Sequence, residues 1–492
     1  MNVNQLGARG EALLSALGRE YYLTGAGRKA TPAFEAIYEQ YADLQSDEAL
    51  ACARGARVPA LVEWVVDLRV GRAVAPYEER QLVWERRARI AVSGRDIPYL
   101  RAAIELQNSP DRAWRIALDR ARAAAGATDL NELRRDRFLR ERETVAAAGF
   151  GADYPAAITA VSGIDLEHLA GQADRLLADT ADLYREGLRH LVRRRLGVPP
   201  DQLVRADTGW AFRADEFDAA FPGDQLLGTA TAQMREMGLD AFVGGRVRVD
   251  AEEREGKQPR AFCVPVRVPD EVYLVLRPHG GHADYRTFWH ELGHAMHFGS
   301  VDRDRSFVDR WLGDMSVTEA FAMLWDHLTL EEGWLQRFTE LGRESGAVSR
   351  IAQLRVELAV SELYLLRRYA GKLRYELELH RSEYGAAMGE RYAERLTAAT
   401  GFRFLEEDHL RDVDPGFYVA RYLRAWQLEG TLAQILTERY ERDWYRNPRA
   451  GGFVQDLMRR GQAEPADRLA AEFSAAPLSF DASVSRLAAV LA

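Results

Sequence analysis

The segment FWHELGHAMHFGS, residues 288–300, holds three histidines and one glutamate in a chain that has 10 histidines in all. Within it, His290, Glu291 and His294 form the pattern H-E-x-x-H. On a helix, residues four apart project from one face, so both imidazoles can bind the same ion. Glu291 is displaced by about 100° around the helix and would lie beside that ion as a general base. The segment therefore predicts a zinc-binding helix.

Two signals place this helix at about residues 284–298. Asp284 is a residue type that caps helix N-termini, and Gly299 is typical of a helix end. The flanking residues are apolar, so the helix should be buried, and buried imidazoles need partners. The alternative is a helix that carries two histidines on its polar edge by chance, which leaves those partners unexplained.

A catalytic zinc site has three protein ligands and one open position, so a third ligand is needed. The metzincin pattern does not supply it, because His297 occupies the position where that class has glycine. The segment GDMSVTEAFAMLWDHL, residues 313–328, offers Glu319 within an apolar run. A carboxylate in such a run tends to be paired or bound to a metal, because an unpaired buried charge is costly. We therefore expect Glu319 to be the third ligand.

Other interpretations of this segment stay open. Ser316 and Glu319 have the spacing of a capping box, which would give the glutamate a structural role. Asp326 and His327 are the competing candidates for the third ligand.

The composition, with 47% hydrophobic and 29% charged residues, is typical of a globular protein. A net charge of −9 argues against a nucleic-acid partner held by phosphate contacts. The two cysteines, Cys52 and Cys263, lie far apart and indicate neither a disulfide framework nor a cysteine metal cluster. No apolar window approaches the length of a membrane span, and the N-terminus lacks a signal-peptide pattern. We expect a cytoplasmic protein without a membrane or nucleic-acid partner.

Helical periodicity dominates residues 1–200 and returns after the histidine cluster. The convincing strands, RVRVD, AFCVPVRV and EVYLVL, lie within residues 244–278. Pro265 inside the second of them indicates a sheet edge or a bulge. The sequence therefore predicts a mostly α fold with one small antiparallel sheet directly before the zinc helix. It also predicts a helical N-terminal region at 1–200 and a catalytic region at 201–492.

The motif HELGHAMH, a glutamate 25 positions after its second histidine, and the upstream EREGKQPRAFC resemble the thimet oligopeptidase and oligoendopeptidase F family of zinc metallopeptidases. The family's strand motif R-x-G-K…A-F matches Arg254, Gly256, Lys257, Ala261 and Phe262. Its two histidine ligands, its glutamate ligand and its catalytic glutamate fall on His290, His294, Glu319 and Glu291. The resemblance is strongest from about residue 244 to 328.

This resemblance implies a two-lobed helical clam with a deep central channel, in which residues 1–200 form much of the upper lobe. It also implies one zinc ion per chain and hydrolysis of short oligopeptides. The edge strand at 261–268 would pair with an extended peptide. A carboxypeptidase of the same fold, or a non-catalytic peptide-binding protein on that scaffold, are the alternatives.

The family also places tyrosines, and often a histidine, near its C-terminal end, where they bind the scissile carbonyl. The segment DHLRDVDPGFYVARYLRAWQLEG, residues 408–430, is similar: Tyr422 matches best, and Tyr418 lies on the same helical face. His409 is close to the family's histidine, although the family's glycine-rich loop is absent. A tyrosine O–H aimed at the oxyanion would supplement the metal; alternatively, Tyr418 and Tyr422 form a packing pair. Three further histidines have open roles: His279, His282 and His297.

Overall fold

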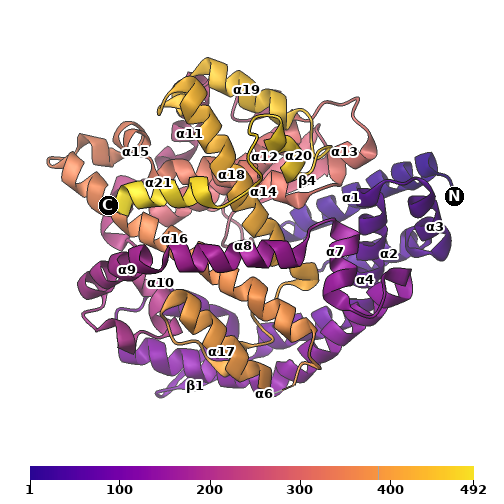
Figure 1. Ribbon diagram of the computed structural model, residues 1–492, viewed down its shortest axis with the longest axis horizontal. Coiled ribbons are helices and arrows are strands. Elements are labelled where there is room, and N and C mark those ends of the chain that lie inside the picture. The colour runs from indigo at the N-terminus through magenta and orange to yellow at the C-terminus, as the bar shows by residue number, and fades with distance from the viewer. Residues whose placement is uncertain (386, 492) are drawn as a thin grey trace. The chain divides into compact units, whose positions relative to one another are not determined.

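The computed structural model describes residues 1–385 and 387–491 and consists mainly of helices (Figure 1). The predicted mostly α class is confirmed. The chain forms two compact units, and neither is contiguous in sequence. Unit 1 comprises Met1–Val65, Ala214–Arg355 and Arg424–Ser485; unit 2 comprises Val66–Arg213, Val356–Leu423 and the described chain from Arg486 onward. The division near residue 200 stays a prediction.

Loops, 3-10 turns and two small sheets join the helices. Those of unit 1 are α1 (Val3–Gly25), α2 (Phe34–Gln40), α3 (Asp47–Gly55), α11 (Leu226–Glu236), α12 (His282–Ser300), α13 (Phe307–Trp311), α14 (Met315–Asp326), α15 (Glu332–Phe338), α19 (Pro448–Met458) and α20 (Ala466–Ala471). Those of unit 2 are α5 (Ala102–Asn108), α6 (Arg112–Val145), α7 (Tyr154–Ser162), α8 (Leu166–Asp179), α9 (Ala181–Arg195), α10 (Thr208–Ala211) and α17 (Ala387–Thr400). Helices with residues in both units are α4 (Pro59–Arg87), α16 (Ala347–His380), α18 (Tyr418–Tyr440) and α21 (Asp481–Leu491).

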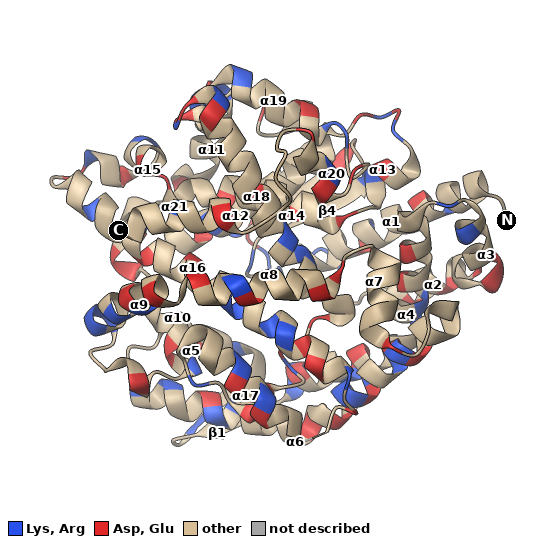
Figure 2. Ribbon diagram, in the orientation of Figure 1, with Lys and Arg blue, Asp and Glu red and all other residues tan. Residues whose placement is uncertain are grey.

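Charged residues of both signs are interspersed along the helices, as α6 and α17 illustrate (Figure 2). Within residues 1–385 and 387–491, no helix combines the length and the apolar composition needed to cross a membrane.

Unit 1 contains a three-stranded sheet of β3 (Val247–Asp250), β4 (Phe262–Arg267) and β5 (Glu271–Val275), in the order β3-β5-β4. The β4–β5 pair is antiparallel, with a register shift between Pro265 and Arg267 that agrees with the expected bulge. The β3–β5 pair is parallel, so the sheet is mixed where the sequence predicted an antiparallel one. The difference arises because residues 251–261 carry the chain across β5, which becomes the middle strand.

The connection between β3 and β4 is held by buried charges. Lys257 donates to Asp250 Oδ1 at 2.9 Å and to the Glu252 carbonyl at 2.7 Å, and Arg254 also pairs with Asp250. These guanidinium and ammonium groups hold the pKa of the Asp250 carboxyl below its usual range, although burial alone would raise it. The R-x-G-K motif therefore fixes the path of this connection.

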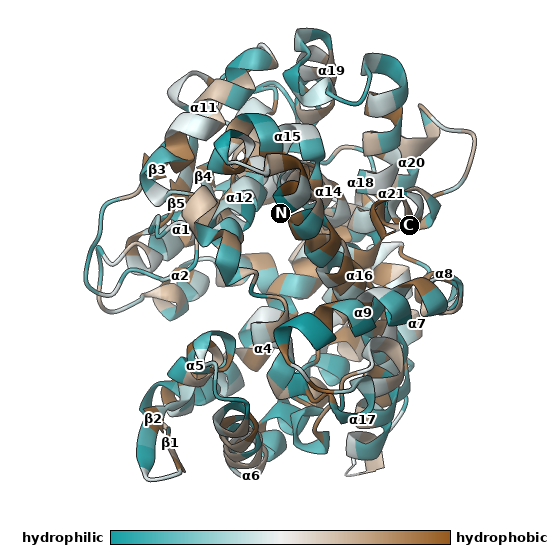
Figure 3. Ribbon diagram, turned by 90° about the vertical axis from the view of Figure 1, so that its left-hand side faces the viewer, coloured by the Kyte–Doolittle hydropathy of each residue, from teal (hydrophilic) through white to brown (hydrophobic). Residues whose placement is uncertain are grey.

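Helices α1 and α12 both pack against this sheet (Figure 3). From α1, Tyr22 stacks on Tyr273 with ring centroids 3.7 Å apart. Gly18 lies so close to β4 that an added Cβ would be 2.3 Å from the Pro265 carbonyl oxygen. The edge of β4 is therefore covered by α1 at Pro265.

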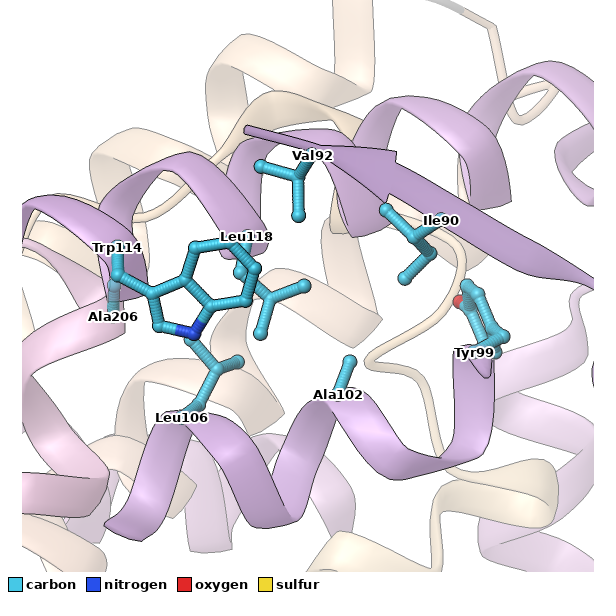
Figure 4. Close-up of a cluster of buried hydrophobic side chains, with 8 residues drawn as sticks. All are labelled: Ile90, Val92, Tyr99, Ala102, Leu106, Trp114, Leu118 and Ala206. Atoms are coloured by element: carbon cyan, nitrogen blue, oxygen red, sulfur yellow. The ribbon is translucent and has the colours of Figure 1, made fainter. Parts of the chain in front are cut away.

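Unit 2 contains a hairpin of β1 (Arg89–Val92) and β2 (Arg95–Pro98), which the helical patterning of this region did not indicate. Its turn, Ser93–Gly94, has positive φ at both residues, as a two-residue hairpin requires. The hairpin packs on a buried cluster (Figure 4) formed by Ile90, Val92, Tyr99, Ala102, Leu106, Trp114, Leu118 and Ala206. Tertiary packing against this cluster therefore stabilises strands too short to stand out in the sequence.

Helix α12 packs most extensively against α14. At the centre of this contact, a Cβ added to Gly293 would lie 2.6 Å from Ala322 Cα and 2.9 Å from the Phe321 carbonyl oxygen. Both are backbone atoms, which cannot move aside as a flexible side chain would. Only glycine permits this approach of the two helices.

We expect Gly293→Ala to lower the free energy of unfolding by about 1–3 kcal/mol, because the methyl group forces α12 and α14 apart. Gly452→Ala is the matched control: Gly452 lies in α19 with nothing within 4 Å of an added Cβ. There, alanine should leave stability unchanged or raise it by about 0.5–1 kcal/mol. Chemical denaturation of both variants measures the difference. Equal stability of the two variants would contradict the close approach.

Candidate metal centre

Helix α12 is longer than the predicted 284–298, and its ends differ from those expected. Its N-cap is Gly281, with φ of 90°. Asp284 lies in the first turn, where Oδ2 accepts hydrogen bonds from the backbone N–H groups of His279 and Gly280, both at 2.9 Å. Asp284 therefore stabilises the preceding loop instead of capping the helix, and Gly299 lies inside the helix instead of ending it.

Helix α14 brings Glu319 into the core of unit 1. Asp314 is the N-cap and accepts from the Ser316 N–H at 2.9 Å, so the capping-box interpretation of Ser316 and Glu319 is wrong. Every residue from 316 to 326 is buried, and Glu319 is only 5% exposed. The glutamate therefore needs a polar or ionic partner.

His290, His294 and Glu319 meet in one group, with their nearest ligand atoms all within 4.8 Å of one another. Glu319 Oε2 lies 3.5 Å from His290 Nε2 and 3.6 Å from His294 Nε2. Two ligand atoms of a tetrahedral zinc ion, each about 2.0–2.1 Å from the metal, lie about 3.3–3.4 Å apart. The chemistry of the donor set and the two distances from Glu319 therefore suit a metal ion, and the three residues are those grouped by the sequence analysis.

The other nitrogen of each imidazole has its own partner. His290 Nδ1 lies 2.9 Å from Asp326 Oδ2, and His294 Nδ1 lies 3.0 Å from Thr318 Oγ1. The Asp326 carboxylate can only accept, so His290 donates through Nδ1 and its Nε2 is the atom that would bind a metal; the Thr318 hydroxyl can accept from His294 Nδ1 in the same way. Asp326, a competing candidate for the third ligand, is therefore placed as a hydrogen-bond partner of His290.

The electrostatics of the group favour positive charge. Burial alone would lower the pKa of His290, but hydrogen bonds to Asp326 and Glu319 raise it to about 10. Burial alone would raise the pKa of Glu319, yet its contacts with His290 and His294 hold it well below its usual range. A divalent cation carries twice the charge of a proton, so the same carboxylates attract it more strongly.

Glu291 follows His290 on α12 and is partly exposed. Its Oε2 accepts a hydrogen bond from the Cys263 N–H of β4 at 2.8 Å, which fixes the carboxylate against the sheet. Burial and the nearby Glu291 raise the pKa of the Cys263 thiol, so this thiol stays protonated and is a poor metal ligand.

The three histidines without assigned roles lie outside the group formed by His290, His294 and Glu319, hereafter the metal-binding group. His297 of α12 is fully buried, and its Nε2 lies 3.2 Å from the Gly461 carbonyl oxygen. Burial lowers its pKa to about 4. His282 is buried with its ring edge-on to Phe221 at 5.3 Å. His279 is exposed. Two of them are therefore packed side chains.

The remaining predicted site residues belong to unit 2, whereas the metal-binding group belongs to unit 1. The Tyr418 and Tyr422 rings are 5.1 Å apart, as expected for residues one turn apart, and Tyr422 also contacts Tyr369 at 5.4 Å. His409 is buried, with Nδ1 2.9 Å from the Glu406 carbonyl oxygen, and burial lowers its pKa. The catalytic roles of Tyr418, Tyr422 and His409 stay predictions.

No protein-family model and no curated protein matches the chain. Among the solved structures that match is a crystal structure described as a "putative peptidase" from Chlamydophila abortus. The two chains are 12% identical with a TM-score of 0.64, and the match covers 99% of this chain and 89% of that one. At this identity the comparison shows a shared fold.

We expect the affinity for Zn²⁺ to fall as the pH is lowered from about 8 to about 6. The pKa of about 10 for His290 lies above this range, so the imidazole is protonated and must lose its proton when the ion binds. Because binding releases one proton, the Kd should rise about tenfold for each unit by which the pH falls. Competition with a calibrated chromophoric chelator measures this slope. His279→Asn, outside the group, should keep the slope, and a Kd independent of pH would rule out a protonated His290.

Proposed function

We propose that the protein is a zinc metallopeptidase that hydrolyses peptide bonds in short oligopeptides. The observation that carries the proposal is the convergence of His290, His294 and Glu319, with Glu291 next to His290 on α12 and hydrogen-bonded to β4. The motif's resemblance to the thimet oligopeptidase and oligoendopeptidase F family supports it. So does the fold shared with a protein described as a peptidase.

In this mechanism, His290, His294 and Glu319 would hold one zinc ion, which would supply Lewis-acid chemistry to the scissile carbonyl and to water. Glu291 takes the proton of the attacking water and transfers it to the leaving amine. The hydrogen bond from the Cys263 N–H to Oε2 keeps the carboxylate oriented for both steps.

The substrate would add an extended segment to the edge of β4. Three features limit this edge: the Cys263 N–H is already donated to Glu291, Pro265 has no N–H, and Gly18 of α1 covers the Pro265 carbonyl. Pairing is therefore confined to the residues before Pro265. An edge this short suits a few residues of peptide backbone rather than a long strand.

The resemblance gives Tyr422 the role of oxyanion donor, with Tyr418 or His409 as further contributors. A hydroxyl aimed at the developing oxyanion stabilises the tetrahedral intermediate more than the ground state.

Two other functions are compatible with the same residues. A carboxypeptidase of the same fold would release single C-terminal residues, whereas an oligoendopeptidase cuts internal bonds. Digestion of a mixed peptide library, with and without chelator and read by mass spectrometry, separates the two. A non-catalytic peptide-binding protein would show no products in either arm.

Replacing Glu291 with glutamine should abolish hydrolysis while Zn²⁺ remains bound, because the amide keeps the size of the side chain but cannot accept the proton. Turnover of a library-derived peptide and metal content by elemental analysis are the two measurements. Glu253→Gln, an exposed glutamate in the loop before β4, is the control and should keep full activity. Hydrolysis retained by Glu291→Gln would show that another group is the base.

Tyr422→Phe should lower kcat by about 10- to 100-fold with metal content and KM nearly unchanged, because it removes one donor to the oxyanion. Tyr440→Phe, at the far end of α18, is the control and should have little effect. A kcat equal to that of the parent protein would leave Tyr422 with a packing role only.

A further inference from the structure

A buried histidine and a buried glutamate, His327 and Glu429, lie behind Asp326, the partner of His290. Asp326 Oδ1 is 3.6 Å from His327 Nε2, and His327 Nδ1 is 3.0 Å from Glu429 Oε2. His327 is 3% exposed and Glu429 is fully buried. A chain of side-chain contacts therefore leads from His290 through Asp326 and His327 to Glu429. All four residues belong to unit 1.

These contacts connect three elements. Asp326 is the last residue of α14, His327 begins the 3-10 turn His327–Leu330, and Glu429 lies on α18. Asp326 uses Oδ2 for His290, while Oδ1 faces His327 and also lies 3.5 Å from Arg286 Nε. The imidazole of His327 thus faces one carboxylate oxygen and is itself fixed from the other side by Glu429.

A buried polar pair of this kind has no obvious value for stability alone. Apolar residues of similar volume usually replace such a pair without loss, because removing polar or charged groups from water is costly. In contrast, mutating the group that hydrogen-bonds the second nitrogen of a metal-ligating histidine typically lowers metal affinity by about 10- to 100-fold. The position of this pair, one contact beyond such a partner, favours the second role.

We propose that His327 and Glu429 are positioning residues of the metal centre, which hold Asp326 in the orientation that binds His290. This inference rests on the proposed metal site. It adds to that site two residues that would touch neither the ion nor the substrate.

The test replaces both residues together, as His327→Leu with Glu429→Met, so that neither side chain is left buried without the other. The readout is the Kd for Zn²⁺ alone, from chelator competition, together with the melting temperature of the metal-free protein. We expect the Kd to rise about 10- to 100-fold while the metal-free melting temperature stays close to that of the parent. An unchanged Kd overturns the proposal.

Combination with Asp326→Asn shows whether the pair acts through Asp326. If it does, the triple variant should have about the same Kd as Asp326→Asn alone, because both changes abolish the same contact of Asp326 with His290. If the two increases multiply, the pair acts independently and the proposal is wrong. Should the double variant not fold, Glu429→Gln takes its place. That change keeps size and an acceptor oxygen, and it should raise the Kd at least about threefold, again without adding to Asp326→Asn.

Two controls separate this inference from the function on which it rests. Tyr22→Phe removes the hydroxyl that donates to the buried Asp250 at 3.1 Å, and it should leave the Kd unchanged. His290→Ala should abolish tight binding of Zn²⁺. If His290→Ala still binds as tightly as the parent, the proposed metal site fails. If only the pair variants bind normally, the positioning role alone fails.

Discussion

The contact of α12 with α14 at Gly293 is the constraint on which the metal-binding group depends. The first helix carries both histidines and the second carries the glutamate, so neither can form the group without the other. A side chain at position 293 would meet the backbone of α14 within 3 Å, which explains why the residue directly before His294 is glycine. The same short distance lets a glutamate side chain reach both imidazoles.

Around this contact, polar side chains face both nitrogens of each histidine ring. Glu319 faces the two Nε2 atoms, and Asp326 and Thr318 face the two Nδ1 atoms. Each ring is therefore oriented through its Nδ1 before any ion binds, and its Nε2 faces Glu319. Such preorganisation means that the rings lose little freedom when an ion binds, so the attraction of the carboxylate is retained as affinity.

Much of this arrangement could be predicted from the sequence because it is encoded locally. The spacing of His290 and His294 fixes their common face, and the isolation of Glu319 in an apolar run indicates a buried partner. The strands before α12 were also recognisable from their alternation. The parallel pairing of β3 with β5 was not, because strand order depends on the path of a connection rather than on residue periodicity.

What escaped prediction depends on contacts between residues distant in sequence. Asp326 was a candidate ligand, and only the structure shows that it faces Nδ1 of His290. The contact of His327 with Glu429 joins positions 102 residues apart, since 429 − 327 = 102, and neither residue type signals the other. The hairpin of β1 and β2 was not predicted for a related reason. Its apolar residues are buried only by packing on a cluster whose other members lie elsewhere in the chain.

The complete burial of α14 from residue 316 to 326 limits how this protein can diversify. A helix with no solvent-facing side has no position where substitutions accumulate harmlessly, and drift along it would threaten folding and ion retention together. Substitutions that leave both the fold and the three side chains His290, His294 and Glu319 in place are therefore to be sought on the surrounding loops and strands rather than on α14.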